Sequence, residues 1–253
     1  MTMPLPAPPL ADDAALARAV AIEAGALLRA ILADPACPAD DLGARGDREA
    51  NALIIARLRA ARPGDYILSE EAPDDGARCA AARVWIIDPL DGTRDFAERR
   101  GDYAVHIGLA IDGVPRVGAV SLPAEPITYS SDAPPPLLPP HGGRPRIAVS
   151  RTRAPALADR VAAAIDGQLL PMGSAGCKAM AVLSGAADIY LHAGGQFEWD
   201  NCAPAAVAMA AGLHASRIDG APLVYNCADP LLPDLLICRP EWAAPVLAAI
   251  AAG

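Results

Sequence analysis

Val84-Trp85-Ile86-Ile87-Asp88-Pro89-Leu90-Asp91-Gly92-Thr93 is the stretch that decides the fold of this chain. Its apolar start predicts a buried strand that ends in two carboxylates three residues apart. Pro89 excludes a helix and favours an extended conformation at Asp88, whereas Gly92 permits a tight turn. Two acids beside free backbone amides suit a hard cation and a phosphate. A strand followed by a simple Asp-Gly turn is the more common meaning of a lone motif of this kind.

The composition limits the class of protein. A chain of 253 residues, 53% of them hydrophobic, is long enough for one large domain or two small ones. Its longest uncharged run, 201–216, is too short to cross a bilayer, and the N-terminus lacks the features of a secretory signal. Six scattered cysteines predict free thiols in a reducing cytoplasm, and four dispersed histidines argue against zinc.

The net charge limits the kinds of molecule that the protein is expected to bind. A formal net charge of −9 disfavours nucleic-acid polymers as partners. It leaves room for a small anionic substrate if metal ions reverse the sign locally. The basic residues are all arginine except Lys178. This lysine either fills a role that needs a compact point charge or remains by chance.

The pattern of elements divides the chain in two. We expect a disordered tail at 1–9, an α+β part at 10–132, a Pro-rich linker at 133–145 and an α/β part at 146–253. The first part is predicted to contain helices at 16–32 and 48–60 and strands at 66–69, 85–88, 103–111 and 117–122, the last two forming a hairpin around Asp112-Gly113. The second part is predicted to contain strands at 146–150, 168–170, 187–192 and 235–239 and helices at 155–165, 177–183, 204–211 and 242–252.

Further acids stand where turns or strand ends would expose them. Asp47 precedes a predicted helix, Glu70 follows a predicted strand, and Asp200 precedes the helix that we expect to open near Pro204. Taken singly, Asp47 and Asp200 are typical of helix caps, and Glu70 is typical of solvated loop charge.

Taken together, these acids and the residues around them match the motifs of a known protein family. Glu70-Glu71, the Asp-Pro-Leu-Asp-Gly-Thr core and Trp199-Asp200 before a small-residue helix resemble the inositol monophosphatase superfamily of magnesium-dependent, lithium-sensitive phosphatases. Gly173 to Lys178, Ala187 to Tyr190 and Glu198 to Asp200 are most similar to its CysQ branch. That branch comprises 3′(2′),5′-bisphosphate nucleotidases, which convert 3′-phosphoadenosine 5′-phosphate into AMP and phosphate. The resemblance spans 16–239 and implies a layered αβαβα sugar-phosphatase fold. It also implies that the enzyme clears a by-product of sulfate assimilation.

The resemblance implies two or three Mg²⁺ ions. Glu70, Asp88 and the Leu90 carbonyl would hold one ion, and Asp88, Asp91 and Asp200 a second, with a weaker third near Glu70. Carboxylates crowded together repel one another unless divalent ions lie between them.

Catalytic roles are implied in the same way. A water activated by the metal would be oriented by Glu70 and by the Thr93 hydroxyl, which Asp47 would support, and no covalent intermediate would form. In place of the threonine-containing sequence usual before Asp47, this chain has Gly43-Ala44-Arg45-Gly46.

The substrate would be held by both halves of the site. The Gly92 and Thr93 amides would receive the phosphate that is cleaved. The rest of the substrate would contact Gly173, Ser174, Lys178 and Glu198. Lys178 would bind a second phosphate or, alternatively, skirt a helix. Glu198 would bind ribose or inositol hydroxyls or, alternatively, be hydrogen-bonded within its own loop.

Several functions stay open at this point. Inositol monophosphatase or fructose-1,6-bisphosphatase activity, alone or in combination, would use the same metal site. A haloacid-dehalogenase-type phosphatase would use Asp88 as nucleophile. The two aspartates of that family's motif are two residues apart, whereas Asp88 and Asp91 are three residues apart. A non-catalytic metal- or anion-binding regulator is a third class. The expected partner is a small phosphorylated molecule, with no nucleic-acid polymer and no membrane, and members of the resembled family are often homodimers.

Overall fold

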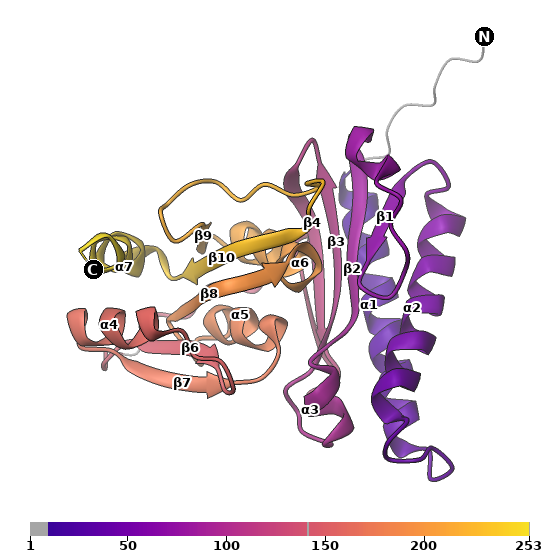
Figure 1. Ribbon diagram of the computed structural model, residues 1–253, viewed down its shortest axis with the longest axis horizontal. Helices are drawn as coiled ribbons and strands as arrows, with labels where there is room; N and C mark the ends of the chain where they lie inside the picture. The colour runs from indigo at the N-terminus through magenta and orange to yellow at the C-terminus, as the bar shows by residue number, and fades with distance from the viewer. Residues whose placement is uncertain (1–9, 141, 253) are drawn as a thin grey trace.

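The computed structural model describes residues 10–140 and 142–252 and contains two five-stranded sheets (Figure 1). The predicted tail at 1–9 lies outside the described residues. The first sheet has the order β1-β2-β3-β4-β5. Its strands are β1 (Tyr66–Ser69), β2 (Arg83–Asp91), β3 (Ala104–Ile111), β4 (Val114–Leu122) and β5 (Ile127–Ser130). β1 and β2 are parallel and the other pairs are antiparallel.

The second sheet has the order β7-β6-β8-β10-β9. Its strands are β6 (Arg146–Ser150), β7 (Gln168–Met172), β8 (Ile189–Phe197), β9 (His214–Ser216) and β10 (Leu231–Cys238). β6 pairs in parallel with β7 and β8, whereas β10 pairs antiparallel with β8 and β9. The segment 131–145, without a helix or strand among its described residues, connects the two sheets.

Helices separate and cover the sheets. They are α1 (Leu10–Ala33), α2 (Leu42–Ala61), α3 (Thr93–Ala97), α4 (Ala156–Ala164), α5 (Ala175–Leu183), α6 (Glu198–Ala210) and α7 (Pro240–Ala251), with a 3₁₀ turn, η1, at Ala77–Ala80. α1 and α2 pack on one face of the first sheet, α5 and α6 lie between the sheets, and α4 and α7 cover the outer face of the second (Figure 1). The expected αβαβα layering is therefore confirmed.

β2 is irregular where its two aspartates stand. Residues i and i+3 of a regular strand point to opposite faces. Asp88 pairs with His106 and Asp91 with Ala104, so β2 has one residue more than β3 between these two pairs, which is a β-bulge. Pro89 lies inside this bulge, where its missing N–H removes no regular ladder bond. The extra residue turns Leu90 toward the α1–α2 core and leaves both carboxylates on the face toward α6.

Glycines bring α6 close to the first sheet. Gly108 of β3 and Gly118 of β4 are cross-strand partners. A Cβ atom at Gly118 would lie 2.4 Å from the Ala203 carbonyl oxygen, and one at Gly108 would lie 2.9 Å from Cys202 Sγ. The absence of side chains here sets the depth at which the N-terminus of α6 reaches the end of β2.

Three predicted helix starts were wrong, and each helix begins six residues earlier than predicted. α1 begins at Leu10 and not at 16. α2 begins at Leu42, so Asp47 lies in its second turn and is not the residue that caps it. Gly43 and Gly46 obscure the helical pattern, but they are needed because added Cβ atoms would lie 2.8 Å from side-chain carbons of Thr93 and Leu90. α6 begins at Glu198, well before Pro204, which lies inside the helix.

The structure confirms several other predicted elements. The strand at 66–69 and the strand at 146–150 have the predicted bounds, and the Asp112-Gly113 turn joins β3 to β4. β5, β9 and η1 were not predicted. All six cysteines are free, four of them buried. Within the described ranges, the helices are too short or too polar to span a bilayer.

Candidate active site

The site lies where the carboxyl ends of β1 and β2 meet the N-terminus of α6. β1 and β2 are parallel with Ser69 opposite Ile87, so Glu70 emerges beside Asp88. The first turn of α6 adds Asp200, whose carboxylate accepts a bond from the Phe197 amide at 2.6 Å. Carboxylate oxygens of Asp88, Asp91 and Asp200 lie within 4.8 Å of one another. Four acids from three distant segments of the sequence thus converge at one point.

Asp91 is well supplied with donors. Its Oδ2 accepts from the Ser174 hydroxyl and from the Gly176 amide at 2.7 Å, and it lies 3.3 Å from His106 Nε2. The other ring nitrogen of His106 lies 3.0 Å from the Trp199 carbonyl oxygen. Burial would raise the pKa of Asp91, but His106, Lys178 and Ser174 hold it below its ordinary value. Asp91 is therefore the anionic member of the cluster.

The other three acids, Glu70, Asp88 and Asp200, have raised pKa values when no cation is bound. Burial, then the charge of Asp200, raises the pKa of Glu70 to about 7. Burial, then the charge of Asp91, raises the pKa of Asp200 to about 6. Burial, then the charges of Glu70 and Asp91, raises the pKa of Asp88 well above its ordinary value. The cluster holds more negative charge than its protein surroundings neutralise.

A buried acid elsewhere in the chain provides a contrast. Asp13 is fully buried, but Arg62 and Arg83 form ion pairs with it at 2.7 and 3.0 Å. In the described part of the chain, neither Asp88 nor Asp200 has an arginine or lysine ion pair. Oxygen donors that converge without a cationic side chain are the donor set that Mg²⁺ prefers, so the residues fit the metal that the motifs implied.

Thr93 lies at the edge of this cluster. Its hydroxyl lies 3.0 Å from the Leu90 carbonyl oxygen and 3.3 Å from Asp47 Oδ1. Burial, then the charge of Glu71, raises the pKa of Asp47 to about 7. Gly92, at φ 92°, turns the chain from β2 into the short helix α3. The structure thus brings Asp47 to Thr93 as expected, although from within α2.

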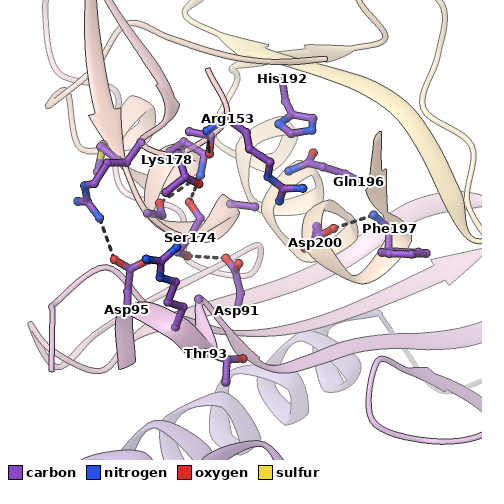
Figure 2. Close-up of a pocket in the computed structure, with 18 of the residues that line it drawn as sticks. Asp91, Thr93, Asp95, Arg153, Ser174, Lys178, His192, Gln196, Phe197 and Asp200 are labelled. Carbon is purple, nitrogen blue, oxygen red and sulfur yellow. Dashed lines mark hydrogen bonds and ion pairs between the residues drawn. The ribbon is translucent and has the colours of Figure 1, made fainter. Parts of the chain in front are cut away.

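A pocket of about 860 Å³ opens over the cluster (Figure 2). The predicted site residues that line it are Glu70, Asp91, Gly92, Thr93, Gly173, Ser174, Lys178 and Asp200. Asp47, Asp88, Leu90 and Glu198 do not line it. Asp88 is 1% exposed and lies beneath the pocket floor.

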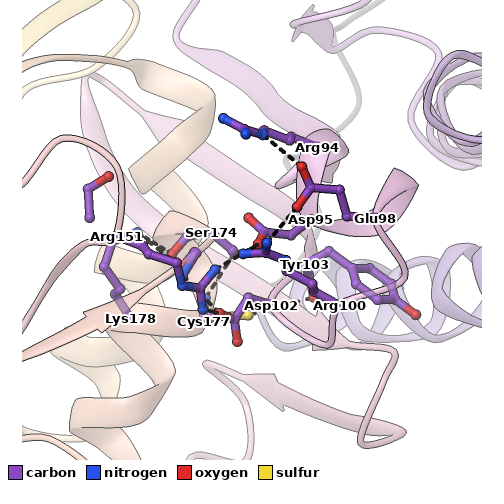
Figure 3. A network of polar contacts seen from close by, with 12 residues as sticks. Arg94, Asp95, Glu98, Arg100, Asp102, Tyr103, Arg151, Ser174, Cys177 and Lys178 are labelled. Atoms are coloured by element: carbon purple, nitrogen blue, oxygen red, sulfur yellow. Dashed lines mark hydrogen bonds and ion pairs between the residues drawn. The ribbon is translucent and has the colours of Figure 1, made fainter.

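Basic side chains stand on the wall opposite the acids. Arg151 bridges Asp95 and Asp102, and Asp102 also accepts from the Gly173 amide at 2.9 Å (Figure 3). Arg153 extends into the pocket (Figure 2), and its guanidinium has no hydrogen bond or ion pair with the described residues. The pocket therefore combines an acidic floor with arginines that are paired with acids, except Arg153, whose guanidinium has no partner among the described residues.

Lys178 has mostly helix-terminal contacts. Its ammonium donates to the Gly173 carbonyl at 3.1 Å and to the Ser174 carbonyl, and it lies 5.3 Å from the centre of the Tyr190 ring. Burial lowers its pKa, although the charge of Asp91 opposes this. These contacts match the alternative of a lysine that skirts a helix, while its place in the pocket wall keeps it near a substrate.

Glu198 requires a correction. Its side chain is fully buried, and its carboxylate accepts from the Asn226 and Cys227 amides at 2.8 and 2.7 Å. The carboxylate is thus hydrogen-bonded to the distant loop at 226–227 and not within its own loop, and contact with substrate hydroxyls stays a prediction that its burial disfavours. Its partners lie almost thirty residues away in the chain, so sequence reasoning could not locate them.

Sequence reasoning also missed three residues of the site: His106, Arg153 and Phe197. A histidine in the otherwise apolar strand 104–111 was the available signal for His106. Arg153 is one of many arginines, and Phe197 stands beside the Glu198-Trp199-Asp200 motif, so neither had a distinguishing pattern.

Comparisons with known proteins identify the family of this chain. The model of the inositol monophosphatase family matches residues 13–133 and 145–251. A 3′-phosphoadenosine 5′-phosphate phosphatase of Mycobacterium tuberculosis is 55% identical over 219 residues, 83% of this chain and 82% of that protein. The 3′(2′),5′-bisphosphate nucleotidase CysQ of Escherichia coli is 33% identical over 201 residues, 71% of this chain and 78% of that protein.

A solved structure agrees as well. The crystal structure of CysQ from Bacteroides thetaiotaomicron superposes with a TM-score of 0.80 at 26% identity, covering 90% of this chain and 97% of that one. The family expected from the motifs is confirmed. Since the matched regions leave out little besides the first residues and part of the linker, the chain as a whole belongs to the inositol monophosphatase family.

Proposed function

We propose that this phosphatase hydrolyses the 3′-phosphate of 3′-phosphoadenosine 5′-phosphate, releasing AMP and phosphate. The observation that carries the proposal is the two-sided pocket of about 860 Å³, in which an acidic floor faces an arginine-bearing wall. A nucleotide bisphosphate has two separated anionic groups, and such a pocket has a place for each. The names of the Mycobacterium and Escherichia relatives point to the same substrate.

The acidic floor supports magnesium as the cofactor. Asp88, Asp91 and Asp200 would hold one ion, and Glu70, Asp88 and the Leu90 carbonyl would hold another. When bound, Mg²⁺ supplies Lewis acidity toward the phosphoryl oxygens and neutralises charge that develops as the ester bond breaks.

The chain's own residues then orient the nucleophile. Glu70 lines the pocket at the end of β1, beside Asp88, and its carboxylate is placed to accept a proton from a water molecule at the acidic floor. The Thr93 hydroxyl, held between Asp47 and the Leu90 carbonyl, fixes the direction of that water. The Gly92 and Thr93 amides stand at the start of α3 and receive the phosphoryl oxygens.

Asp91 acts as a fixed ligand. The bonds from Ser174 and Gly176 both go to its Oδ2, so Oδ1 stays available to a cation. Ser174 itself adopts a left-handed φ of 46°, a strained conformation for a residue with a Cβ atom. The loop before α5 thereby ties the second half of the chain to the metal-binding end of β2.

The test is a side-by-side measurement of kcat/KM. The purified enzyme with Mg²⁺ is given 3′-phosphoadenosine 5′-phosphate, inositol-1-phosphate and fructose-1,6-bisphosphate. The proposal expects the nucleotide to have the highest kcat/KM. A clear preference for inositol phosphate or for the sugar bisphosphate would assign the enzyme to another activity of the family. A trapped phosphoaspartate at Asp88 would contradict direct attack by water.

Variants test the cationic wall. Removal of Arg153 by Arg153→Ala should raise KM for the nucleotide bisphosphate far more than for 3′-AMP, because only the bisphosphate has the second anionic group. Lys178→Ala should also act mainly on the bisphosphate if its ammonium binds that phosphate. Equal losses for both substrates would limit Lys178 to support of the Gly173–Ser174 loop.

A further inference from the structure

A stacked aromatic pair stands in the wall of the pocket. The rings of Phe197 and Trp199 lie parallel, with centroids 4.7 Å apart and planes 9° apart. Both residues line the pocket. Phe197 is 42% exposed, a large apolar surface for a residue at the end of a strand. Figure 2 shows its ring beside Asp200, at the rim of the acidic floor.

The pair is rigidly supported. Trp199 is partly buried and packs against the core between the two sheets, and its carbonyl oxygen lies 3.0 Å from His106 Nδ1. The Phe197 amide donates to Asp200 at 2.6 Å. Trp199 covers one face of the Phe197 ring, so a further ring can stack only on the opposite face. Such a surface offers stacking area with little loss of side-chain freedom.

We propose that the free face of Phe197, supported by Trp199, is the stacking surface for the nucleobase of the substrate. The inference rests on the proposed function and adds the residues that select a nucleotide over other phosphate esters. Planar bases stack on aromatic side chains whatever their hydrogen-bonding edge, and a purine offers the larger face. Because Phe197 is bonded to Asp200, the base surface and the metal-binding acids keep a fixed relation.

The charges around the pair fit the rest of a nucleotide. Arg153 and Gln196 line the same part of the pocket, and the Arg153 guanidinium has no partner among the described residues. A base on Phe197 would therefore leave a cation for the 5′-phosphate while the 3′-phosphate reaches the acidic floor. Leu231, the cross-strand neighbour of Phe197, is 50% exposed, so contact with a second copy of the chain is the competing use of this ring.

The experiment compares two substrates in three variants. The substrates are 3′-phosphoadenosine 5′-phosphate and the same sugar bisphosphate with hydrogen in place of adenine. Phe197→Leu keeps the bulk but removes the aromatic face, and Phe197→Trp restores one. Ile127→Ala is the matched control, since Ile127 is 41% exposed on β5 and does not line the pocket.

The expected result is specific to the base. Phe197→Leu should raise KM for the adenine substrate about ten-fold, the size of the loss of one base–aromatic contact, with kcat changed less than about two-fold. The base-free substrate should be unaffected, Phe197→Trp should behave as the wild type, and Ile127→Ala should change neither substrate. An unchanged preference for the adenine substrate in Phe197→Leu would overturn the inference. A wild-type enzyme inactive on the adenine substrate would instead overturn the proposed function.

Binding without turnover gives a second measurement. Of the three tryptophans, Trp199 is the one that lines the pocket, so AMP stacked on the pair should quench tryptophan emission. Phe197→Leu should weaken that binding about ten-fold. If Phe197→Leu left AMP binding unchanged but shifted the mass measured by light scattering, the ring would belong to an interface between copies, and the proposal would be wrong.

Discussion

The acids of the site differ in how they are paired. Asp91 Oδ2 accepts hydrogen bonds from a hydroxyl and an amide, and His106 Nε2 lies 3.3 Å from the same oxygen. Asp88 receives a single amide bond, from Leu90 at 3.0 Å, and is 1% exposed. A buried carboxylate with so little support is held only by the rest of the fold and is expected to need a cation in the working enzyme. Substitutions at Asp88 should therefore separate folding from activity.

The first prediction concerns Asp88→Asn. The amide has the same size and still accepts from the Leu90 amide, so the fold should persist. The melting temperature of the metal-free protein should stay the same or rise, because burial and the charges of Glu70 and Asp91, which oppose ionisation of Asp88, do not act against a neutral amide. The value of kcat should fall by roughly 10³-fold or more, the size expected when a group that helps stabilise developing charge is removed. Steady-state kinetics and thermal unfolding check both parts.

A matched control sharpens this test. Asp40 is exposed on the loop before α2, so Asp40→Asn removes the same charge from the chain without touching the site. It should leave kcat and the melting temperature unchanged. Substantial activity in Asp88→Asn would show that Asp88 is not needed as a ligand. The same loss in Asp40→Asn would show that net charge and not a ligand is being measured.

The second prediction concerns pH and Asp47. Burial, then the charge of Glu71, raises the pKa of Asp47 from 3.8 to about 7. Between about pH 4 and 7 the folded state therefore holds a proton that the unfolded chain releases. The contribution of this group to the free energy of unfolding must then decrease as pH rises through that window. Asp47→Asn removes the titration, so the variant should gain stability over the wild type as pH increases.

The measurement is urea denaturation of both proteins in chelator at pH 5, 6, 7 and 8. The difference in free energy of unfolding should grow up to about pH 7 and then level off. Glu70, with a pKa also near 7, remains in both proteins, but the charge of Asp47 contributes to raising that pKa, so a smaller part of the difference comes from Glu70. A difference that is constant from pH 5 to 8 would contradict a raised pKa at Asp47.

β2 shows what sequence patterns can and cannot reveal about an element. The apolar run 84–87 and the acids after it predicted a strand that delivers carboxylates. The strand nevertheless continues to Asp91, because the bulge accommodates Pro89 and Leu90. The bulge arises from the register in which β2 pairs with β3, and the sequence of β2 alone does not determine that register. The pattern thus predicted the ligands but not how they come to share a face.

α6 illustrates the opposite case. Pro204 was interpreted as a start signal because proline favours the first turn of a helix. In the structure the Asp200 carboxylate, bonded to the Phe197 amide, supports the helix start at Glu198. The role of Glu198 depends on amides at 226 and 227. Contacts of that separation are set by tertiary packing, which local pattern does not encode.

The third prediction tests the approach of α6 to the first sheet. In Gly118→Ala the new methyl group would lie 2.4 Å from the Ala203 carbonyl oxygen, so α6 must move. We expect a loss of about 1–3 kcal/mol in the free energy of unfolding, which is typical of overpacking. Asp200 moves with α6, so the Mg²⁺ concentration for half-maximal activity should also rise. Chemical denaturation and a magnesium titration measure the two effects.

Gly64→Ala is the control for this substitution. A Cβ atom there would have nothing within 4 Å, so stability and the magnesium requirement should match the wild type. If Gly118→Ala were as stable as Gly64→Ala and needed no additional Mg²⁺, the close approach of α6 to β4 would not position Asp200.

The molecule as a whole places its chemistry between two layers. Asp88 and Asp91 come from the first sheet, whereas Asp200 comes from a helix that packs between the sheets. Cations bound there would connect the first sheet to α6, which are otherwise joined by packing and by the contact between His106 and the Trp199 carbonyl. The family pattern in the sequence predicted this convergence, but residue spacing alone did not, because the acids come from distant parts of the chain.

The last prediction follows from that placement. A ligand that binds only the folded state stabilises it by RT ln(1 + [L]/Kd), about 2.7 kcal/mol at one hundred times Kd. Mg²⁺ should therefore raise the melting temperature of the wild type and of Asp40→Asn but not that of Asp88→Asn. Hydrogen exchange should slow at 88–93 and 197–201 together, since one site joins both segments. Protection confined to one of these segments, or full turnover after chelation, would mean that the acids do not share a cation and that the site works by other chemistry.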